Sequence, residues 1–170
     1  MSSDQRLVSN GVQGRKAFFS FPDPVDDAAA RTVAAGVVLQ VALLLITRDR
    51  LLLIPLCYGF MARVLSGPKI SPLGLIATRI VAPRLKALSK PVPGKPKRFA
   101  QGIGAIMSLT AAVLSLTVSS FVPAAIVLVF LGAAATLEAA AGFCLGCKLF
   151  ALLFRIGLVG YDDCPNCVLR

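Results

Sequence analysis

Long apolar runs, separated by short polar segments, make up most of the chain. The first carries no charge from Thr32 to Thr47, and it reaches the length of about 20 residues needed to cross a bilayer once residues 28–31 are included and Arg31 extends toward the headgroups. A later run, Phe99–Leu137, has no charged residue over 39 positions, which is too long for one crossing, and SSFVP at 119–123 is its natural break. We therefore expect four membrane-spanning α-helices, at residues 28–47, 51–67, 99–119 and 122–142.

The second expected span, Leu51–Gly67, is the weakest, because only its first twelve residues are uncharged. Arg63 lies near its end, where the side chain can reach the headgroups, and Pro55 can kink the helix. The sequence leaves open whether this segment crosses the membrane completely.

The segment 68–98 is basic and rich in proline. Its first part alternates apolar and basic residues in a pattern that favours a short helix in the membrane interface, broken at Pro83, and an ordinary solvated loop is the alternative. The stretch SKPVPGKPK at 89–97 is typical of a linker.

Composition agrees with a membrane location. Of the 170 residues 56% are hydrophobic and only 15% are charged, whereas soluble domains carry about a quarter charged residues. The first thirty residues are polar and have no compact apolar core of the kind that marks a secretory signal. We expect an all-α, polytopic integral membrane protein, divided into a polar segment (1–27), a four-span domain (28–147) and a C-terminal apolar helix with a cysteine tail (148–170).

The net charge of +10 is better explained by lipid headgroups and topology than by nucleic acid, because the basic residues flank the apolar runs. Residues 63–98 contain nine Lys and Arg and no acidic residue, so the positive-inside rule places this loop in the cytoplasm. Four spans then leave both termini cytoplasmic. The chain has no histidine, which excludes serine–histidine catalysis, imidazole-bound haem and every metal site that needs a histidine.

Small residues recur at four-residue spacing in the last two expected spans, and this spacing permits close helix contact in lipid. The small residues are Ala100, Gly104 and Ser108 in one span and Gly132, Thr136 and Ala140 in the other. We expect these two helices to pack together, and chance spacing in an alanine-rich stretch is the alternative.

Two cysteine pairs are the main candidates for chemistry: Cys144 with Cys147, and Cys164 with Cys167. Each C-x-x-C pair can form a reversible dithiol, with Lys148 favouring a thiolate in the first. The spacing also fits a zinc site that uses all four cysteines, but the chain would have to fold back across an apolar segment. The third possibility is that the thiols only pack.

Glu138 is the only acidic residue within an apolar span, and intramembrane carboxylates are functional candidates. It lies six residues before Cys144, so it can carry protons for thiol chemistry, pair with a basic residue such as Arg98, or serve only as a hydrated carboxylate. Cys57, alone in the second span, is expected to act as a small hydrophobic side chain.

Three segments, SGPKISPLGLIATRIVAPRL, KRFAQGIG and LEAAAGFCLGCKLF, resemble in this order a four-span bacterial membrane family catalogued as a domain of unknown function. The resemblance covers roughly residues 25–155 and rests on its RFAQ-x-x-G and G-[FY]-C-L-G-C segments. These correspond to Arg98, Phe99, Ala100, Gln101 and Gly104, and to Gly142, Phe143, Cys144, Leu145, Gly146 and Cys147. The family lends no established activity. It implies a bacterial inner-membrane location and, because thioredoxin-like or rhodanese-like genes often lie nearby, sulfur or thiol chemistry.

From these patterns we predict a thiol-redox or sulfur-relay role, carried by Cys144, Cys147 and Glu138, with a soluble thioredoxin-like or rhodanese-like partner. No cofactor is firmly predicted. The alternative is a non-catalytic membrane subunit or scaffold, in which Cys144, Cys147, Cys164 and Cys167 hold a structural zinc ion.

Overall fold

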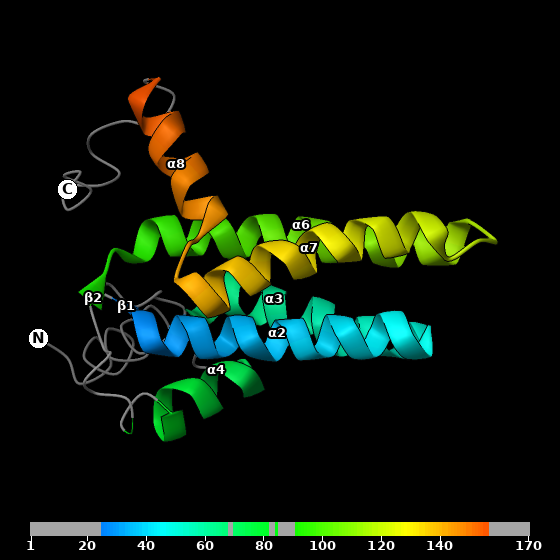
Figure 1. The fold of residues 1–170 in the computed structure, drawn as a ribbon, viewed down its shortest axis with the longest axis horizontal. Helices are drawn as coiled ribbons and strands as arrows, with labels where there is room; N and C mark the ends of the chain where they lie inside the picture. The colour runs from blue at the N-terminus through cyan, green and yellow to red at the C-terminus, as the bar shows by residue number, and fades with distance from the viewer. Residues whose placement is uncertain (1–24, 68–69, 82–83, 85–90, 157–170) are drawn as a thin grey trace, which may run out of the picture.

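The computed structural model describes residues 25–67, 70–81, 84 and 91–156. Four helices lie side by side as a bundle, and α8 packs on α6 near one end and extends away from the bundle at a steep angle (Figure 1). The helices of the bundle are α2 (Asp27–Thr47), α3 (Leu53–Ser66), α6 (Gly94–Thr117) and α7 (Val122–Ala141), and α8 is Leu145–Arg155. The all-α class is confirmed.

Local sequence explains where α2 and α7 begin and end. Asp26 caps α2, its side chain accepting a 2.9 Å hydrogen bond from the Ala28 N–H, and Arg48 ends the helix in the left-handed region at φ 56°. Pro123 lies in the first turn of α7, where its missing N–H costs nothing. Gly142 ends that helix at φ 66°, a conformation that favours glycine. Both helices agree with the predicted spans to within one residue at each end.

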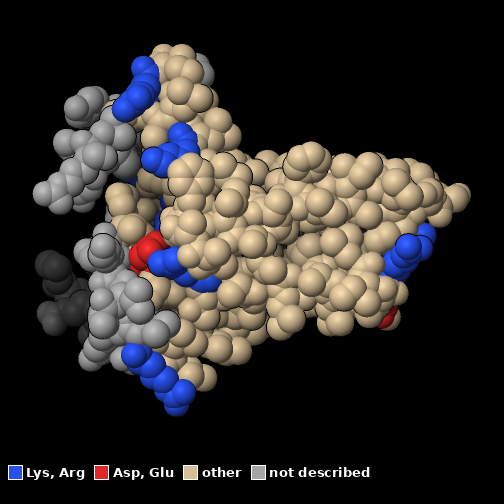
Figure 2. Space-filling model, in the orientation of Figure 1, with Lys and Arg blue, Asp and Glu red and all other residues tan. Residues whose placement is uncertain are grey.

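Three of the described helices, α2, α6 and α7, are long and apolar enough to cross a membrane. Large apolar side chains on them face outward, including Leu39 at 72% and Leu116 at 75% exposure, as expected for a surface that contacts lipid. In Figure 2 the charged residues gather at the two ends of the bundle, and the belt between them is uncharged on the visible face. These features identify a membrane protein.

The segment predicted as the second span is shorter than the others. A 3₁₀ turn, Arg50–Leu52, precedes α3, whose 14 residues extend about 21 Å and do not by themselves cover a hydrocarbon core of about 30 Å. The helix nevertheless packs along α6, within the bundle. Complete crossing by residues 51–67 stays a prediction.

The core runs along the middle of the bundle and joins all four helices. Among its buried residues, Val41 comes from α2, Phe60 from α3 and Leu128 from α7. The expected packing of the last two spans against each other is confirmed, since α6 lies against α7. Their glycines, however, face other helices. Gly104 of α6 faces the Phe60 ring of α3, and Gly132 of α7 faces Val41 of α2, so each glycine makes room for a large side chain on a different helix.

The basic segment contains the predicted short helix, in two parts: α4 (Pro72–Ile76), followed by a π-helical turn at Ala77–Val81. The expected break at Pro83 lies outside the described residues. Two-residue strands, β1 (Val25–Asp26) and β2 (Pro91–Val92), pair in antiparallel fashion beside the start of α6. Helix α6 begins at Gly94, so residues 94–97, expected in a linker, are helical.

Candidate functional site

The connection between α7 and α8 sets the position of both thiols of the first pair. Gly142 turns the chain out of α7, and the Arg31 guanidinium from α2 donates hydrogen bonds to the carbonyl oxygens of Ala139 (3.3 Å) and Ala140 (2.6 Å). Arg31 was expected to extend toward the headgroups. Instead it satisfies carbonyls at the end of α7 and complements the negative end of the helix dipole.

Helix α8 begins at the cysteine pair. Cys144 is its N-cap, and the Cys144 Sγ accepts a 3.3 Å hydrogen bond from the backbone N–H of Cys147. The two Sγ atoms lie 2.6 Å apart, with the Cys147 thiol donating to Cys144. Cys144 is 8% exposed and Cys147 is half-buried. Cys147 is therefore the more exposed residue of the two.

This geometry makes the two thiols unequal. The hydrogen bond from the Cys147 thiol lowers the pKa of the Cys144 thiol, and the Cys147 N–H and the positive charge of Lys97 act in the same direction, against burial and the Glu138 charge. Donating that hydrogen bond, together with burial, raises the pKa of the Cys147 thiol. Cys144 is thus the more acidic thiol of the two and forms a thiolate more readily than Cys147.

Close packing of α8 on α6 holds the pair in place. A Cβ atom built on Gly146 would lie 2.5 Å from the Ala100 Cβ and 2.7 Å from the Ala100 Cα, so only glycine permits this approach. One turn further on, the Phe150 ring packs on Phe99 with centroids 5.5 Å apart. Gly146 therefore contributes a close contact between α8 and α6 that a side chain would prevent.

An ion cluster lies beside the thiols and joins three helices. Lys97 of α6 donates to Glu138 of α7 at 2.7 Å and lies 3.5 Å from the Asp27 carboxylate of α2. The Lys97 side chain is only 7% exposed. Burial of these charges is tolerated because they are paired. The partner suggested for Glu138, Arg98, instead donates to the Val64 carbonyl at 3.0 Å.

A second polar group lies deeper, between α3 and α6. The buried Arg63 guanidinium stacks over the Phe60 ring at 4.6 Å and donates to the Gln101 Oε1 at 2.9 Å and to the Ser71 Oγ at 3.3 Å. Arg63 was expected to reach the headgroups, but it points into the protein. Because an arginine can only donate, it fixes the Gln101 amide with its oxygen toward Arg63 and its NH₂ group available elsewhere.

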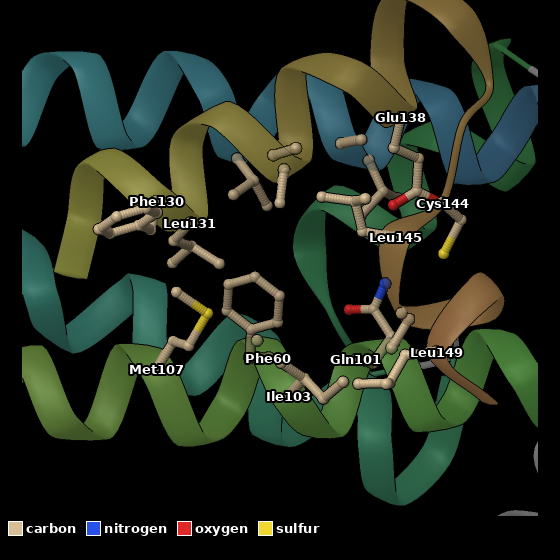
Figure 3. Close-up of a pocket in the computed structure, with 18 residues that line it drawn as sticks. Phe60, Gln101, Ile103, Met107, Phe130, Leu131, Glu138, Cys144, Leu145 and Leu149 are labelled. Atoms are coloured by element: carbon tan, nitrogen blue, oxygen red, sulfur yellow. The ribbon is translucent and has the colours of Figure 1, made fainter. Parts of the chain in front are cut away.

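A cavity of about 430 Å³ lies between α6, α7 and α8 and the helices α2 and α3. One residue from each of the groups described above lines it: Cys144, Glu138 and Gln101. Figure 3 shows Glu138, Cys144 and Gln101 at one end and Phe60, Met107 and Phe130 at the other. The remaining lining is almost entirely apolar. The cavity therefore has a polar end that contains the thiolate-forming cysteine and a long apolar end.

Comparison with known protein families gives one result that bears on identity. A family model described as DUF4395, a domain of unknown function, matches residues 25–155, well over half of the chain. The chain belongs to this family. No curated protein and no solved structure matches it. The DUF4395 match contains the whole site described above, from Asp27 to Cys147.

Within this DUF4395 domain the structure brings together the three predicted site residues Cys144, Cys147 and Glu138. Cys57 lies apart in α3 and is half-buried. The second pair, Cys164 and Cys167, lies outside the described residues, and among those described no group of three or more potential ligands could hold a metal ion. The four-cysteine zinc hypothesis therefore stays untested.

Lys97 and Asp27 were missed by the sequence analysis. Both lie at the polar ends of apolar runs, where a charge is normally explained by the headgroups, and only the bundle brings them to Glu138. Gln101 was named only through the family resemblance. The sequence did offer a signal for Gln101, because it is a polar residue at the third position of the uncharged run Phe99–Leu137.

Proposed function

We propose that this chain is a bacterial inner-membrane thiol-redox protein whose Cys144–Cys147 dithiol exchanges with a soluble thioredoxin-like or rhodanese-like partner. The observation that carries the proposal is the 2.6 Å approach of the two sulfurs at the N-terminus of α8. Two cysteines three positions apart can form a disulfide with little backbone movement when their sulfurs already converge.

The unequal thiols suggest the order of steps. A thiolate of the partner attacks the oxidised pair at the half-buried Cys147, a bond forms between the two sulfurs, and Cys144 leaves as the thiolate. The lowered pKa of Cys144 makes it the better leaving group. The second cysteine of the partner, as a thiolate, then attacks the partner's first sulfur in the mixed disulfide. This step releases Cys147, which takes up a proton. The partner dithiol becomes a disulfide, and the pair becomes two thiols.

The distribution of charge supports a cytoplasmic location for the site and for both termini. The described turn between α2 and α3 carries Arg48 and Arg50 with Asp49, whereas the opposite end of the bundle carries most of the other described Lys and Arg residues. The positive-inside rule assigns the more basic end to the cytoplasm. Cytosolic reductants keep thiols reduced, so a pair there cycles rather than forming a permanent disulfide.

Trapping the mixed disulfide tests the proposal. The full chain with Cys57, Cys164 and Cys167 replaced by serine (the three-serine protein) is oxidised in nanodiscs and mixed with a thioredoxin that lacks its second cysteine. We expect a stable adduct on Cys147, located by peptide mass spectrometry. The control Cys144→Ser, in the same background, cannot form the Cys144–Cys147 disulfide that the thioredoxin thiolate attacks. It should therefore give no adduct.

Two results would contradict the proposal. An adduct on Cys144 would reverse the assigned order of attack. Absence of any adduct, together with stoichiometric zinc in the protein with all five cysteines that is lost when either pair is mutated, would favour the scaffold alternative with a cysteine-ligated zinc.

A further inference from the structure

We infer that the cavity beside Cys144 binds a lipid-soluble quinone, which accepts the two electrons of the Cys144–Cys147 dithiol. This inference rests on the proposed redox function and names the second substrate of the same site. A dithiol that a soluble partner reduces needs an oxidant to complete its cycle, and the position of Cys144 indicates where that oxidant binds.

The first argument is that the two cysteines differ in exposure and in contact with the cavity. Cys144, the thiolate-forming cysteine, is 8% exposed and lines the cavity, whereas the half-buried Cys147 is absent from the cavity lining. A soluble protein therefore approaches Cys147 more readily than Cys144. A molecule inside the cavity contacts Cys144 directly.

The shape and lining of the cavity are the second argument. Its volume of about 430 Å³ falls in the range of small-molecule sites, about 300–1,000 Å³. Three of its lining residues, Phe130, Leu145 and Leu149, are also exposed on the apolar outer surface of the protein. The cavity therefore reaches the protein surface beside apolar side chains of α7 and α8, which suit an apolar molecule better than a charged oxidant such as glutathione disulfide.

The polar end of the cavity matches the functional groups of a quinone. The Gln101 NH₂ group, turned toward this end by the Arg63 hydrogen bond, is a donor for a ring carbonyl oxygen, and in Figure 3 it lies on the side of Glu138 and Cys144. A lipid acyl chain would fill the apolar end but would use neither the amide nor the thiolate. A flat ring with two acceptor oxygens and an apolar tail uses both ends.

The electron transfer balances with the groups present. The Cys144 thiolate adds to a ring carbon and forms a C–S bond. Cys147 gives up its proton and attacks the Cys144 Sγ, so an S–S bond forms, the C–S bond breaks, and the electron pair stays on the ring. The ring oxygens take up the Cys147 proton and the proton that Cys144 had released, so the quinol carries both. Two thiols and a quinone become a disulfide and a quinol.

Decylubiquinone and menaquinone-4 serve as probes. The reduced three-serine protein in nanodiscs is mixed with each, and the ultraviolet absorbance of the oxidised ring is followed while free thiols are counted. We expect one quinol per protein and loss of both thiols with at least one probe. Cys144→Ser should abolish the reaction.

A matched pair of substitutions locates the reaction. Ala134 lines the cavity and its neighbour Ala133 is exposed on the outside of the same helix. Ala134→Phe should lower the rate of quinol formation at least tenfold, and Ala133→Phe should leave it unchanged. Adduct formation between oxidised Ala134→Phe protein and the thioredoxin variant, which needs no quinone, verifies that the substituted protein is folded.

The outcomes separate this inference from the proposed function. If the thioredoxin adduct forms but neither quinone is reduced, the quinone inference is overturned and the exchange function stands. Quinol formation that Ala134→Phe leaves unchanged also overturns the inference, because the reaction would then occur outside the cavity. If neither reaction occurs, both proposals fail.

Discussion

Gly146→Ala tests how the packing of α8 on α6 controls the thiols. Carbon atoms in contact normally lie about 3.5–4.0 Å apart. A Cβ on Gly146 would lie 2.5 Å from the Ala100 Cβ and 2.7 Å from its Cα, and backbone cannot rotate aside as a side chain can. The substitution must therefore move α8 away from α6 by about 1 Å.

Gly102→Ala is the matched control, because a Cβ there meets no atom within 4 Å. Both glycines are helical, so both variants gain up to about 1 kcal/mol of helix propensity, and the difference between them isolates the steric effect. Overpacking of this kind costs about 1–3 kcal/mol. We expect Gly146→Ala to be less stable than Gly102→Ala by that amount.

Circular dichroism during titration with sodium dodecyl sulfate measures the free energy of unfolding in a chain without tryptophan. Thioredoxin-adduct formation, measured on the same samples, should slow in Gly146→Ala because Cys144 and Cys147 move with the start of α8. Equal stability and equal adduct rates for the two alanine variants would refute the close contact between α8 and α6.

Three further predictions concern charge. Lys97→Met should raise the pKa of Cys144, and slower alkylation by iodoacetamide at neutral pH measures this. It should also lower the free energy of unfolding by about 3–5 kcal/mol, because Glu138 loses its buried partner. Unchanged alkylation would exclude Lys97 from thiolate stabilisation. The lowered pKa of Cys144 stabilises the reduced pair at pH values above that pKa, and this stabilisation is lost as the pH falls through it. The midpoint potential should accordingly fall by about 59 mV per pH unit below the pKa and about 30 mV per unit above it. The break should lie below the ordinary thiol value of 9.0, and a break at or above that value would contradict the assignment. Cysteines introduced at Ser89 and Ser119 into a cysteine-free chain should be labelled by a membrane-impermeant maleimide from the cytoplasm and from outside, respectively, and labelling of Ser89→Cys from outside alone would reverse the topology.

The spans α2 and α7 were predictable because lipid imposes a simple rule on sequence. A helix that contacts hydrocarbon must be apolar over its whole length, and Asp26 and Gly142 mark the ends with ordinary capping chemistry. The start of α6 was not predictable in this way. Pro96 and Lys97 suggested a linker, but proline is tolerated in a first helical turn and Lys97 pairs with Glu138.

The site was predictable in its cysteines and its carboxylate but not in their neighbours. Sequence spacing placed Cys144 and Cys147 within one helical turn. The positions of Lys97, Asp27 and Arg63 depend on how separate helices pack, and periodicity carries no information on which helix faces which. The small-residue spacing correctly predicted that α6 and α7 pack together, but it did not show that Gly104 accommodates Phe60 of α3.

A redox titration of the Cys144–Cys147 pair tests the central claim most directly. The three-serine protein is equilibrated in nanodiscs with thioredoxin couples of graded reduced fraction, quenched with acid and alkylated, and the intact mass is measured. The account predicts one reversible two-electron transition, in which the protein goes from two alkyl groups to none as the pair becomes a disulfide. A pair that stays fully reduced or fully oxidised across the whole range would contradict it.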